Sequence, residues 1–355
     1  MTSKKFLFLA CIAGAALVSG CKEQAKDAAA SATEAATAAA APLTAAGSVD
    51  FPGYTGDFDH FAIDTKDNRL FLTGEEFHEV EVLDRLTGKI IKRLPGFGVP
   101  HSLFYMPEKN EMLVIDGEKP SAVLDAATLE VKRTLPLAKG ADSIGFDKST
   151  GHLWVVTGGK DVPQPDSYLN EIDPATGKVL KSIHFDSNHV EAMAVQQNGP
   201  NLFINVTDKN YLAVVDKASG KVVKTWPIKE AQENAPLAMD EVGHRLFVVT
   251  RKPGKLVVLN ADTGESLATF TAPERTDQVV WDAANRRVYA TGGEGYTLVV
   301  EQDDPDHYRE VAKVPTAPGA KTSILDSENN RFWIAASPGE TGAMGKLLWF
   351  DVAPR

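Results

Sequence analysis

Residues able to bind a cation or move a proton recur along this chain at a nearly constant spacing. Seven positions follow one another every 41 to 49 residues: Asp59, His101, Asp142, Glu191, Ala235, Asp277 and Lys321. All of them except Ala235 and Lys321 carry a carboxylate or an imidazole. Carboxylate oxygens suit Ca²⁺ or Mg²⁺, and an added imidazole shifts the preference toward Zn²⁺ or Mn²⁺. If the fold brings these positions together, they form a site for a divalent metal ion or for a cationic or polyhydroxylated ligand.

A second set of residues lies one position later in each repeat: His60, Ser102, Ser143, Ala192, Pro236, Gln278 and Thr322. His60 would join the candidate site, and a metal ion held there would activate water for the hydrolysis of a lactone or an ester. The alternative is that these carboxylates are simply solvated in a polar channel. The alignment also allows a slip of one residue in the second and fourth repeats, which would move His101 or Glu191.

The elements that must position these residues are short strands that repeat along the chain. One hairpin pattern has an apolar strand ending in an acidic or polar residue, a turn and a second apolar strand, as in FAIDTKDNRLFL and VVWDAANRRVYA. The other has Asp or Asn in its turn, as in VEVLDRLTGKIIKRL. The Asp is predicted to cap the turn, and glycine is predicted to supply a positive φ at positions 88, 177, 220 and 264. Two hairpins give four antiparallel strands per unit.

The period of the repeat predicts the fold. The first strand of each unit ends at Asp64, Met106, Asp147, Gln196, Asp240, Asp282 or Asp326, which gives seven units of about 44 residues, the length of a four-stranded propeller blade. The sequence therefore predicts an all-β fold, a seven-bladed β-propeller with four-stranded antiparallel blades, over residues 46–355. The seventh unit ends one strand short at Val352. We expect the N-terminal segment Ala46–Tyr54 to supply that outermost strand and close the ring.

The turn D-x-x-T-G-K, following an apolar R-L-F-V strand, resembles the YVTN-type repeat of bacterial envelope propellers of the YncE-like group. The resemblance covers about residues 58–352 and implies the same fold. It implies no single activity, because the group includes binding proteins and members without an assigned activity. Its relatives include lactonase propellers and quinoprotein-like domains.

Charge and cysteine content narrow the range of functions. The formal net charge is −11 at pH 7, which argues against nucleic acid as a partner. The two cysteines, Cys11 and Cys21, lie in the first 21 residues. The predicted propeller therefore has no disulfide, no thiolate metal ligand and no cysteine nucleophile. The sequence identifies no cofactor with certainty, and the one that its residue types suggest is a divalent metal ion.

The N-terminus is predicted to be a targeting signal rather than part of the fold. Two lysines precede an apolar run at residues 6–18, which is long enough for a signal-peptide core but too short to span a bilayer. The run ends in Val18-Ser19-Gly20-Cys21, which resembles a bacterial lipobox. The resemblance implies that residues 1–20 are removed and that Cys21 is lipidated, with an ordinary cleaved signal as the alternative.

The residues around this signal predict a location in the bacterial cell envelope. Lys22 follows the cysteine where a retention signal for the inner membrane would have Asp, which favours the outer membrane, facing the periplasm. Residues 21–45 are mostly alanine without an aromatic side chain, and such a segment is expected to be a disordered tether.

Two functions are consistent with these observations. The first is a non-enzymatic scaffold that binds a protein, glycan or small-molecule partner on a face lined by loops. The second is a metal-dependent lactone or ester hydrolase that uses the acidic ring. Outside the ring, Glu75-Glu76-Phe77-His78 is expected to be a solvated turn and His189 a surface residue.

Overall fold

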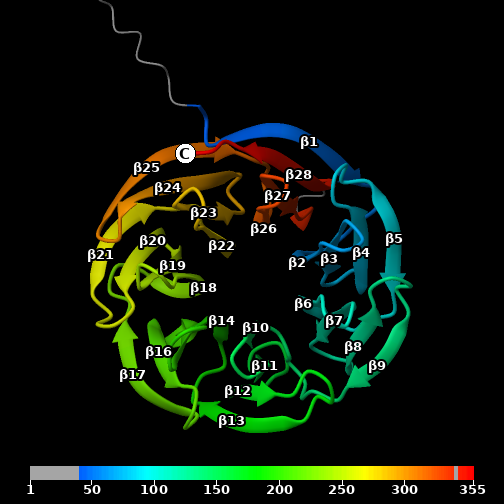
Figure 1. The fold of residues 1–355 in the computed structure, drawn as a ribbon, viewed down its shortest axis with the longest axis horizontal. Coiled ribbons are helices and arrows are strands. Elements are labelled where there is room, and N and C mark those ends of the chain that lie inside the picture. The colour runs from blue at the N-terminus through cyan, green and yellow to red at the C-terminus, as the bar shows by residue number, and fades with distance from the viewer. Residues whose placement is uncertain (1–39, 340–342) are drawn as a thin grey trace, which may run out of the picture. The chain divides into compact units, whose positions relative to one another are not determined.

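The described chain forms a closed ring of seven four-stranded antiparallel sheets (Figure 1). A computed structural model describes residues 40–339 and 343–355. The predicted signal peptide, Cys21 and residues 21–39 of the predicted tether lie outside these ranges. The prediction of an all-β, seven-bladed propeller is confirmed. None of the described residues belongs to a helix with the length and apolarity needed to cross a membrane.

In the first six blades the strands run in sequence order from the channel outward. The first blade contains β2 (Phe58–Asp64), β3 (Arg69–Gly74), β4 (Glu79–Asp84) and β5 (Ile90–Pro95). The second contains β6 (Pro100–Met106), β7 (Glu111–Asp116), β8 (Ser121–Asp125) and β9 (Val131–Leu135). The third contains β10 (Ile144–Asp147), β11 (His152–Gly158), β12 (Ser167–Ile172) and β13 (Val179–Phe185). The fourth and fifth are β14 (Val190–Val195), β15 (Asn201–Val206), β16 (Tyr211–Asp216) and β17 (Lys221–Pro227); and β18 (Gln232–Asp240), β19 (Arg245–Lys252), β20 (Gly254–Asn260) and β21 (Ser266–Thr271). The sixth is β22 (Thr276–Asp282), β23 (Arg287–Gly292), β24 (Tyr296–Asp304) and β25 (His307–Pro315). The seventh has β26 (Ala320–Asp326), β27 (Arg331–Ala336), β28 (Gly345–Val352) and, outermost, β1 (Leu43–Phe51).

The ring closes by pairing the two ends of the described chain, as predicted. β1 runs antiparallel to β28 from Leu43 opposite Val352 to Phe51 opposite Gly345. The strand begins three residues before the predicted start, so residues 43–45 belong to the blade and not to the tether. Leu43 is 4% exposed and packs in the apolar cluster between blades six and seven. In the sequence, a single leucine after a run of alanines does not indicate that a strand begins at Leu43.

Apolar side chains from adjacent blades pack against one another and form the core between the blades. Between blades one and two, Phe71 and Val82 contact Met112 and Val114. The equivalent interface between blades seven and one includes Trp333. Each blade thus buries both faces of its sheet, which leaves the inner edge of each first strand facing the channel.

The turn between the third and fourth strands has the predicted chemistry. In blade one, the Oδ1 atom of Asp84 accepts hydrogen bonds from the backbone N–H of Leu86 and of Thr87. Gly88 then adopts a φ of +69°, and the three other predicted glycines also have positive φ. In blade two, Leu129 takes this position with a φ of +64°.

We predict that Gly264→Ala destabilises the fold more than Gly220→Ala does. Both glycines occupy the same turn position, with φ of +77° and +65°. A Cβ at Gly264 would lie 2.3 Å from the Trp226 ring, whereas at Gly220 the nearest atom is 3.2 Å away on the flexible Lys181 side chain. We expect losses in the free energy of unfolding of about 2–3 kcal/mol and about 1 kcal/mol, measured by denaturant unfolding. Equal losses would contradict this account of the Trp226 contact.

A buried ion pair joins blade one to blade seven. Arg85 donates from Nε to Oδ2 of Asp326 over 2.7 Å, and it also bonds Oδ1 through Nη2. The side chains are 2% and 0% exposed. The pair thus links the first blade to the seventh. Removal of Arg85 would leave the carboxylate of Asp326 buried without its cation, which is strongly destabilising.

Arg85→Leu is expected to lower the free energy of unfolding by about 3–5 kcal/mol. The matched control is Lys346→Met, which removes an exposed ion pair between Lys346 of β28 and Asp50 of β1. This change is expected to lower the free energy of unfolding by less than about 1 kcal/mol. Denaturant unfolding of both variants measures the difference. A loss for Arg85→Leu as small as that of the control would show that the pair does not stabilise closure.

Candidate functional site

The ring positions predicted from the repeat converge at one mouth of the channel. All seven, from Asp59 to Lys321, line a cavity of about 370 Å³. Each lies within the first four residues of the innermost strand of its blade or just before that strand, and these strands all begin at the same end of the ring. All seven aligned positions, His101 and Glu191 included, therefore lie at this one mouth.

Three of these side chains form a group that can hold a metal ion. His101 Nδ1 lies 2.8 Å from Asp59 Oδ2 and 3.8 Å from Asp142 Oδ1. The ligand atoms of the three residues all lie within 4.8 Å of one another. They come from blades one, two and three, so neighbouring blades supply one ligand each. We call these three residues the acidic triad.

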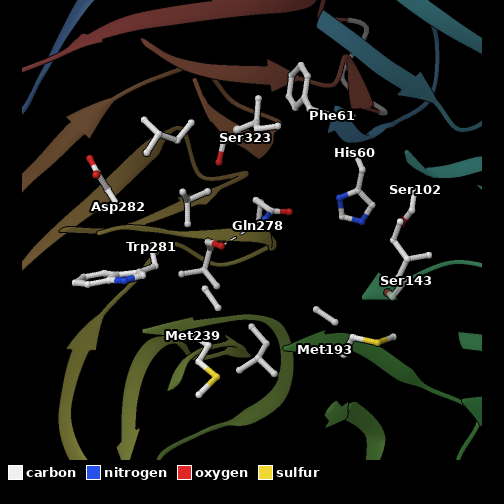
Figure 2. A pocket seen from close by; sticks show the side chains of 18 of the residues that line it. His60, Phe61, Ser102, Ser143, Met193, Met239, Gln278, Trp281, Asp282 and Ser323 are labelled. Atoms are coloured by element: carbon white, nitrogen blue, oxygen red, sulfur yellow. Dashed lines mark hydrogen bonds between the residues drawn. The ribbon is translucent and has the colours of Figure 1, made fainter. Parts of the chain in front are cut away.

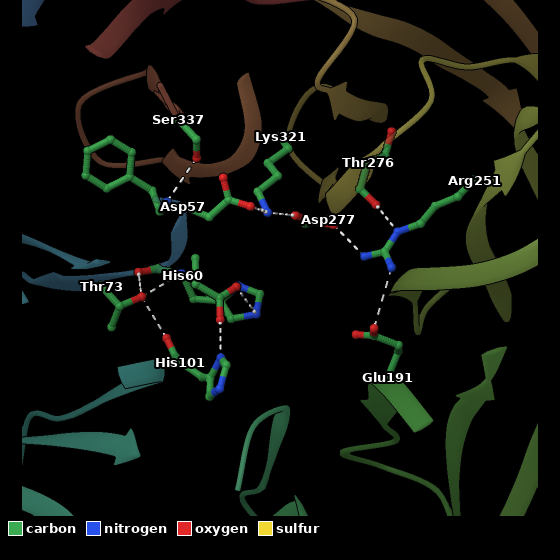
Figure 3. Close-up of polar contacts among 12 residues, drawn as sticks. Asp57, His60, Thr73, His101, Glu191, Arg251, Thr276, Asp277, Lys321 and Ser337 are labelled. Atoms are coloured by element: carbon green, nitrogen blue, oxygen red, sulfur yellow. Dashed lines mark hydrogen bonds and ion pairs between the residues drawn. The ribbon is translucent and has the colours of Figure 1, made fainter. Parts of the chain in front are cut away.

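A buried threonine of β3 fixes the backbone on which this group is built. Thr73 Oγ1 accepts a hydrogen bond from the N–H of His60 (2.8 Å) and donates one to the carbonyl of His101 (2.7 Å) (Figure 3). The His101 side chain packs against Gly117, where an added Cβ would lie 3.1 Å from Nε2. Only 5% of His101 is exposed. The imidazole is thus held in one place beside Asp59.

The electrostatics of the triad couple its members. Burial alone would lower the pKa of His101, but Asp142, Asp59 and Glu75 outweigh it and raise the pKa to about 10. Although burial acts in the opposite direction, His60 and His101 hold the pKa of Asp59 well below its usual range. The imidazole of His101 is therefore protonated at neutral pH and shares its charge between two carboxylates.

Two other carboxyl groups at the mouth have raised pKa values. Burial raises the pKa of Asp142 to about 6. Attraction by His101 opposes this shift, and repulsion from Asp59 and Glu191 adds to it. Burial and the charge of Asp59 raise the pKa of Glu75 to about 8. Burial is the main cause of both shifts, and repulsion from neighbouring carboxylates adds to it. A bound cation would offset the repulsion.

The remaining acidic ring positions are paired with basic side chains instead. Arg251 lies 2.5 Å from Asp277 and 3.6 Å from Glu191, measured between charged atoms (Figure 3). Lys321 contacts Asp57 at 2.6 Å and Asp277 at 2.9 Å. Glu191 and Asp277 thus lie beside basic side chains, and the group of close ligand atoms contains Asp59, His101 and Asp142 without them. We call this set the paired side of the mouth.

Two further ring predictions differ in detail. His60 lies with Nε2 3.4 Å from Asp59 Oδ1, so it supports the triad carboxylate and is not part of the triad. Ala235 is buried and contributes no polar group. The mouth is thus asymmetric: the carboxylates of the triad lie beside imidazoles, whereas Asp57, Glu191 and Asp277 lie beside lysine or arginine.

Several residues at the mouth were not predicted from the sequence: Asp57, Glu75, Lys160, Arg251 and Arg275, with His189 beside Glu191. His189, predicted to be a surface residue, is half-buried with Nε2 2.5 Å from Glu191 Oε1, and Lys160 lies 3.5 Å from the same oxygen. Glu75, predicted to lie in a solvated turn, faces the channel.

A second alignment would have found two of the missed residues. Gly74 is paired with Phe58 and Thr250 with Asn234, so the ends of the second strands lie beside the starts of the first. Glu75 and Arg251 directly follow Gly74 and Thr250. An alignment of the ends of the second strands would therefore have placed both at the mouth.

Comparisons with known proteins agree with the fold and add no activity. No family model matches this chain, and no curated protein matches it. The chain is similar to one in the crystal structure of a mitotic checkpoint complex, with a TM-score of 0.68 and 14% identity over 87% of this chain and 92% of that one. It is equally similar to a chain of Kuenenia stuttgartiensis hydrazine synthase, with a TM-score of 0.68 and 16% identity over 81% and 94%. At these identities the likeness supports the propeller fold alone.

Glu75→Gln is expected to change the dependence of stability on pH. Because the folded pKa of Glu75 is raised from 4.5 to about 8, the folded protein binds more protons than the unfolded chain between these values, and stability falls as pH rises through this interval. The variant removes this contribution. At pH 8 it should exceed the parent protein in stability by on the order of 2 kcal/mol, with little difference at pH 4.

Denaturant unfolding across pH 4–9 measures the effect. The matched control is Glu265→Gln, an exposed carboxylate in the outer turn between β20 and β21, which should keep the slope of the parent protein. A Glu75→Gln variant that loses stability with pH as steeply as the parent would contradict the assignment of this carboxyl group.

Proposed function

We propose that this protein is a non-enzymatic binding protein of the bacterial cell envelope, and that its propeller holds a cationic ligand at the acidic triad. The cavity at the mouth is of the size that binds small molecules. The rigid ring presents side chains from seven blades to one axis, which suits binding without a conformational change. A small-molecule ligand is thus preferred over a protein or glycan partner.

The observation that carries the proposal is the uneven compensation of charge. The side chains of Arg251, Lys321 and Lys160 form ion pairs with carboxylates of the paired side. Arg275 also lines the mouth and bonds the carbonyl of Gly293. On the other side, one imidazolium is shared between Asp59 and Asp142, and Glu75 adds a third carboxyl group. A cation bound there would gain charge-assisted contacts and would restore the carboxyl pKa values toward their usual range.

The proposed location rests on the sequence. The lipobox-like segment ending at Cys21 and the resemblance to YVTN repeats both favour an envelope protein anchored in a membrane by lipid. Several acyl chains on Cys21 would supply firm attachment. Metabolic labelling with a fatty acid tests this, since label should be incorporated by the parent chain and be absent from Cys21→Ala.

A metal-dependent lactone or ester hydrolase is the second candidate, favoured by the geometry of the triad. Three protein ligands with an open side are typical of catalytic metal sites, where the remaining position holds water or substrate. A metal ion would have to displace the proton of His101, so its affinity would increase with pH. Asp59, His101 and Asp142 would be the ligands.

One set of measurements distinguishes the two candidates. The melting temperature is followed with Ca²⁺, Mn²⁺, Zn²⁺ or methylammonium, with and without chelator, in the parent protein and in Asp59→Asn/Asp142→Asn. A bound cation should raise the melting temperature of the parent protein by mass action and have little effect on the double variant. Glu265→Gln serves as the control that retains the response.

Turnover decides between binding and catalysis. Chelator-sensitive hydrolysis of lactones or esters, lost in the double variant, would favour the hydrolase. Stabilisation by a cation without turnover would favour the binding protein. If no cation changes the melting temperature of the parent protein, the proposed site is wrong.

A further inference from the structure

A second and larger cavity lies along the channel beyond the acidic mouth. Its volume is about 800 Å³, and it extends to the ends of the inner strands at Asp282 and the following turn residues. The mouth lies at the opposite ends of the same strands. His60, Ser143 and Ala192 line both cavities, so the two spaces adjoin one another. We call the larger one the lower chamber.

The wall of the lower chamber combines apolar side chains with His60, Gln278, Asp282 and several serines (Figure 2). The last positions of the inner strands place Ala238 and Met239 of β18, Val280 and Trp281 of β22, and Ile324 of β26 on this wall. These side chains are half-buried, and each also packs against one of the apolar clusters between the blades. The wall therefore keeps apolar surface in contact with water, and covering it with an apolar molecule is favourable.

The chamber wall also contains a polar group without a partner. Ser323 lines the chamber, and its Oγ is buried with no hydrogen-bond partner among the described residues. Buried hydroxyl groups are normally hydrogen-bonded. Because an alkyl chain offers no hydrogen bond, this hydroxyl does not itself favour an apolar molecule in the chamber.

The two cavities together point to a ligand with two unlike ends. We propose that the ligand is an amphipathic cation whose ammonium head lies at the acidic triad and whose apolar chain occupies the lower chamber. This inference rests on the proposed function and names its ligand class. Along an inner strand, four residues separate the ring position at the mouth from the last apolar position on the chamber wall. In an extended strand this is about 13 Å, which is the length of a chain of about ten carbons.

Titration with a series of alkylammonium ions tests the proposal. Methylammonium, butylammonium and decylammonium are titrated calorimetrically into the full chain carrying Cys21→Ala, so that no acyl group or detergent competes. Each buried methylene strengthens binding about fourfold, and decylammonium should bind at least about tenfold more tightly than butylammonium. Decanol, which lacks the charge, should bind at least about tenfold more weakly than decylammonium.

Variants assign the two ends of the ligand to the two cavities. Ala238→Phe fills the chamber, and it should weaken decylammonium at least about tenfold while leaving methylammonium within twofold. Val280→Thr keeps the volume but adds a polar atom, and it should weaken decylammonium by a smaller factor. Val242→Thr, at a position that is 96% exposed, is the control that should change neither. Asp59→Asn/Asp142→Asn should weaken both ions.

The outcomes separate this inference from the function on which it rests. If methylammonium binds but chain length has no effect, or if decylammonium binds Ala238→Phe as tightly as the parent protein, the amphipathic ligand is wrong and the cation site stands. If decanol binds as tightly as decylammonium, the charged head is wrong. If no member of the series and no metal ion binds, both the inference and the proposed function are overturned.

Discussion

Closure of the ring is the constraint on which the rest of the structure depends. Antiparallel pairing of β1 with β28 completes the seventh blade, and the buried pair of Arg85 with Asp326 links that blade to the first. A propeller blade is an open sheet with exposed edges, and the ring satisfies its faces only when every blade has two neighbours. The positions of all seven inner strands follow from this condition.

The site depends on closure because no single blade contains it. Asp59, His101 and Asp142 lie 42 and 41 residues apart in the chain, and each is placed by the start of a different inner strand. Thr73 joins the first two through the backbone. A change in the angle between blades would separate the ligand atoms, so the stability of the ring and the geometry of the triad are expected to vary together.

Much of the fold was predictable because each blade repeats the same local chemistry. The caps at Asp84 and its equivalents, and the glycines with positive φ, gave the turns and the period. The start of β1 at Leu43 was missed because its burial depends on partners three hundred residues away. The convergence of the ring positions was also predictable, since equal positions in equal units must lie at one end of the channel.

The division of the ring into an acidic triad and a paired side was not predictable from the aligned first strands. It depends on Arg251 and Asp57, which enter the mouth from the end of a second strand and from the segment before β2. The alignment treated Glu191 and Asp277 as equal to Asp59 and Asp142, because the residue types are equal. What differs is the neighbouring cation, which is a property of the folded ring.

The central claim is that the acidic triad is a cation site with excess negative potential. The most direct measurement is the number of protons released when methylammonium binds at pH 7, obtained by titration in buffers of different ionisation enthalpy. Since Glu75 has a pKa of about 8 and Asp142 of about 6, binding should release a measurable fraction of a proton, and Glu75→Gln should reduce it. Binding without proton release, or with release unchanged in that variant, would contradict the account.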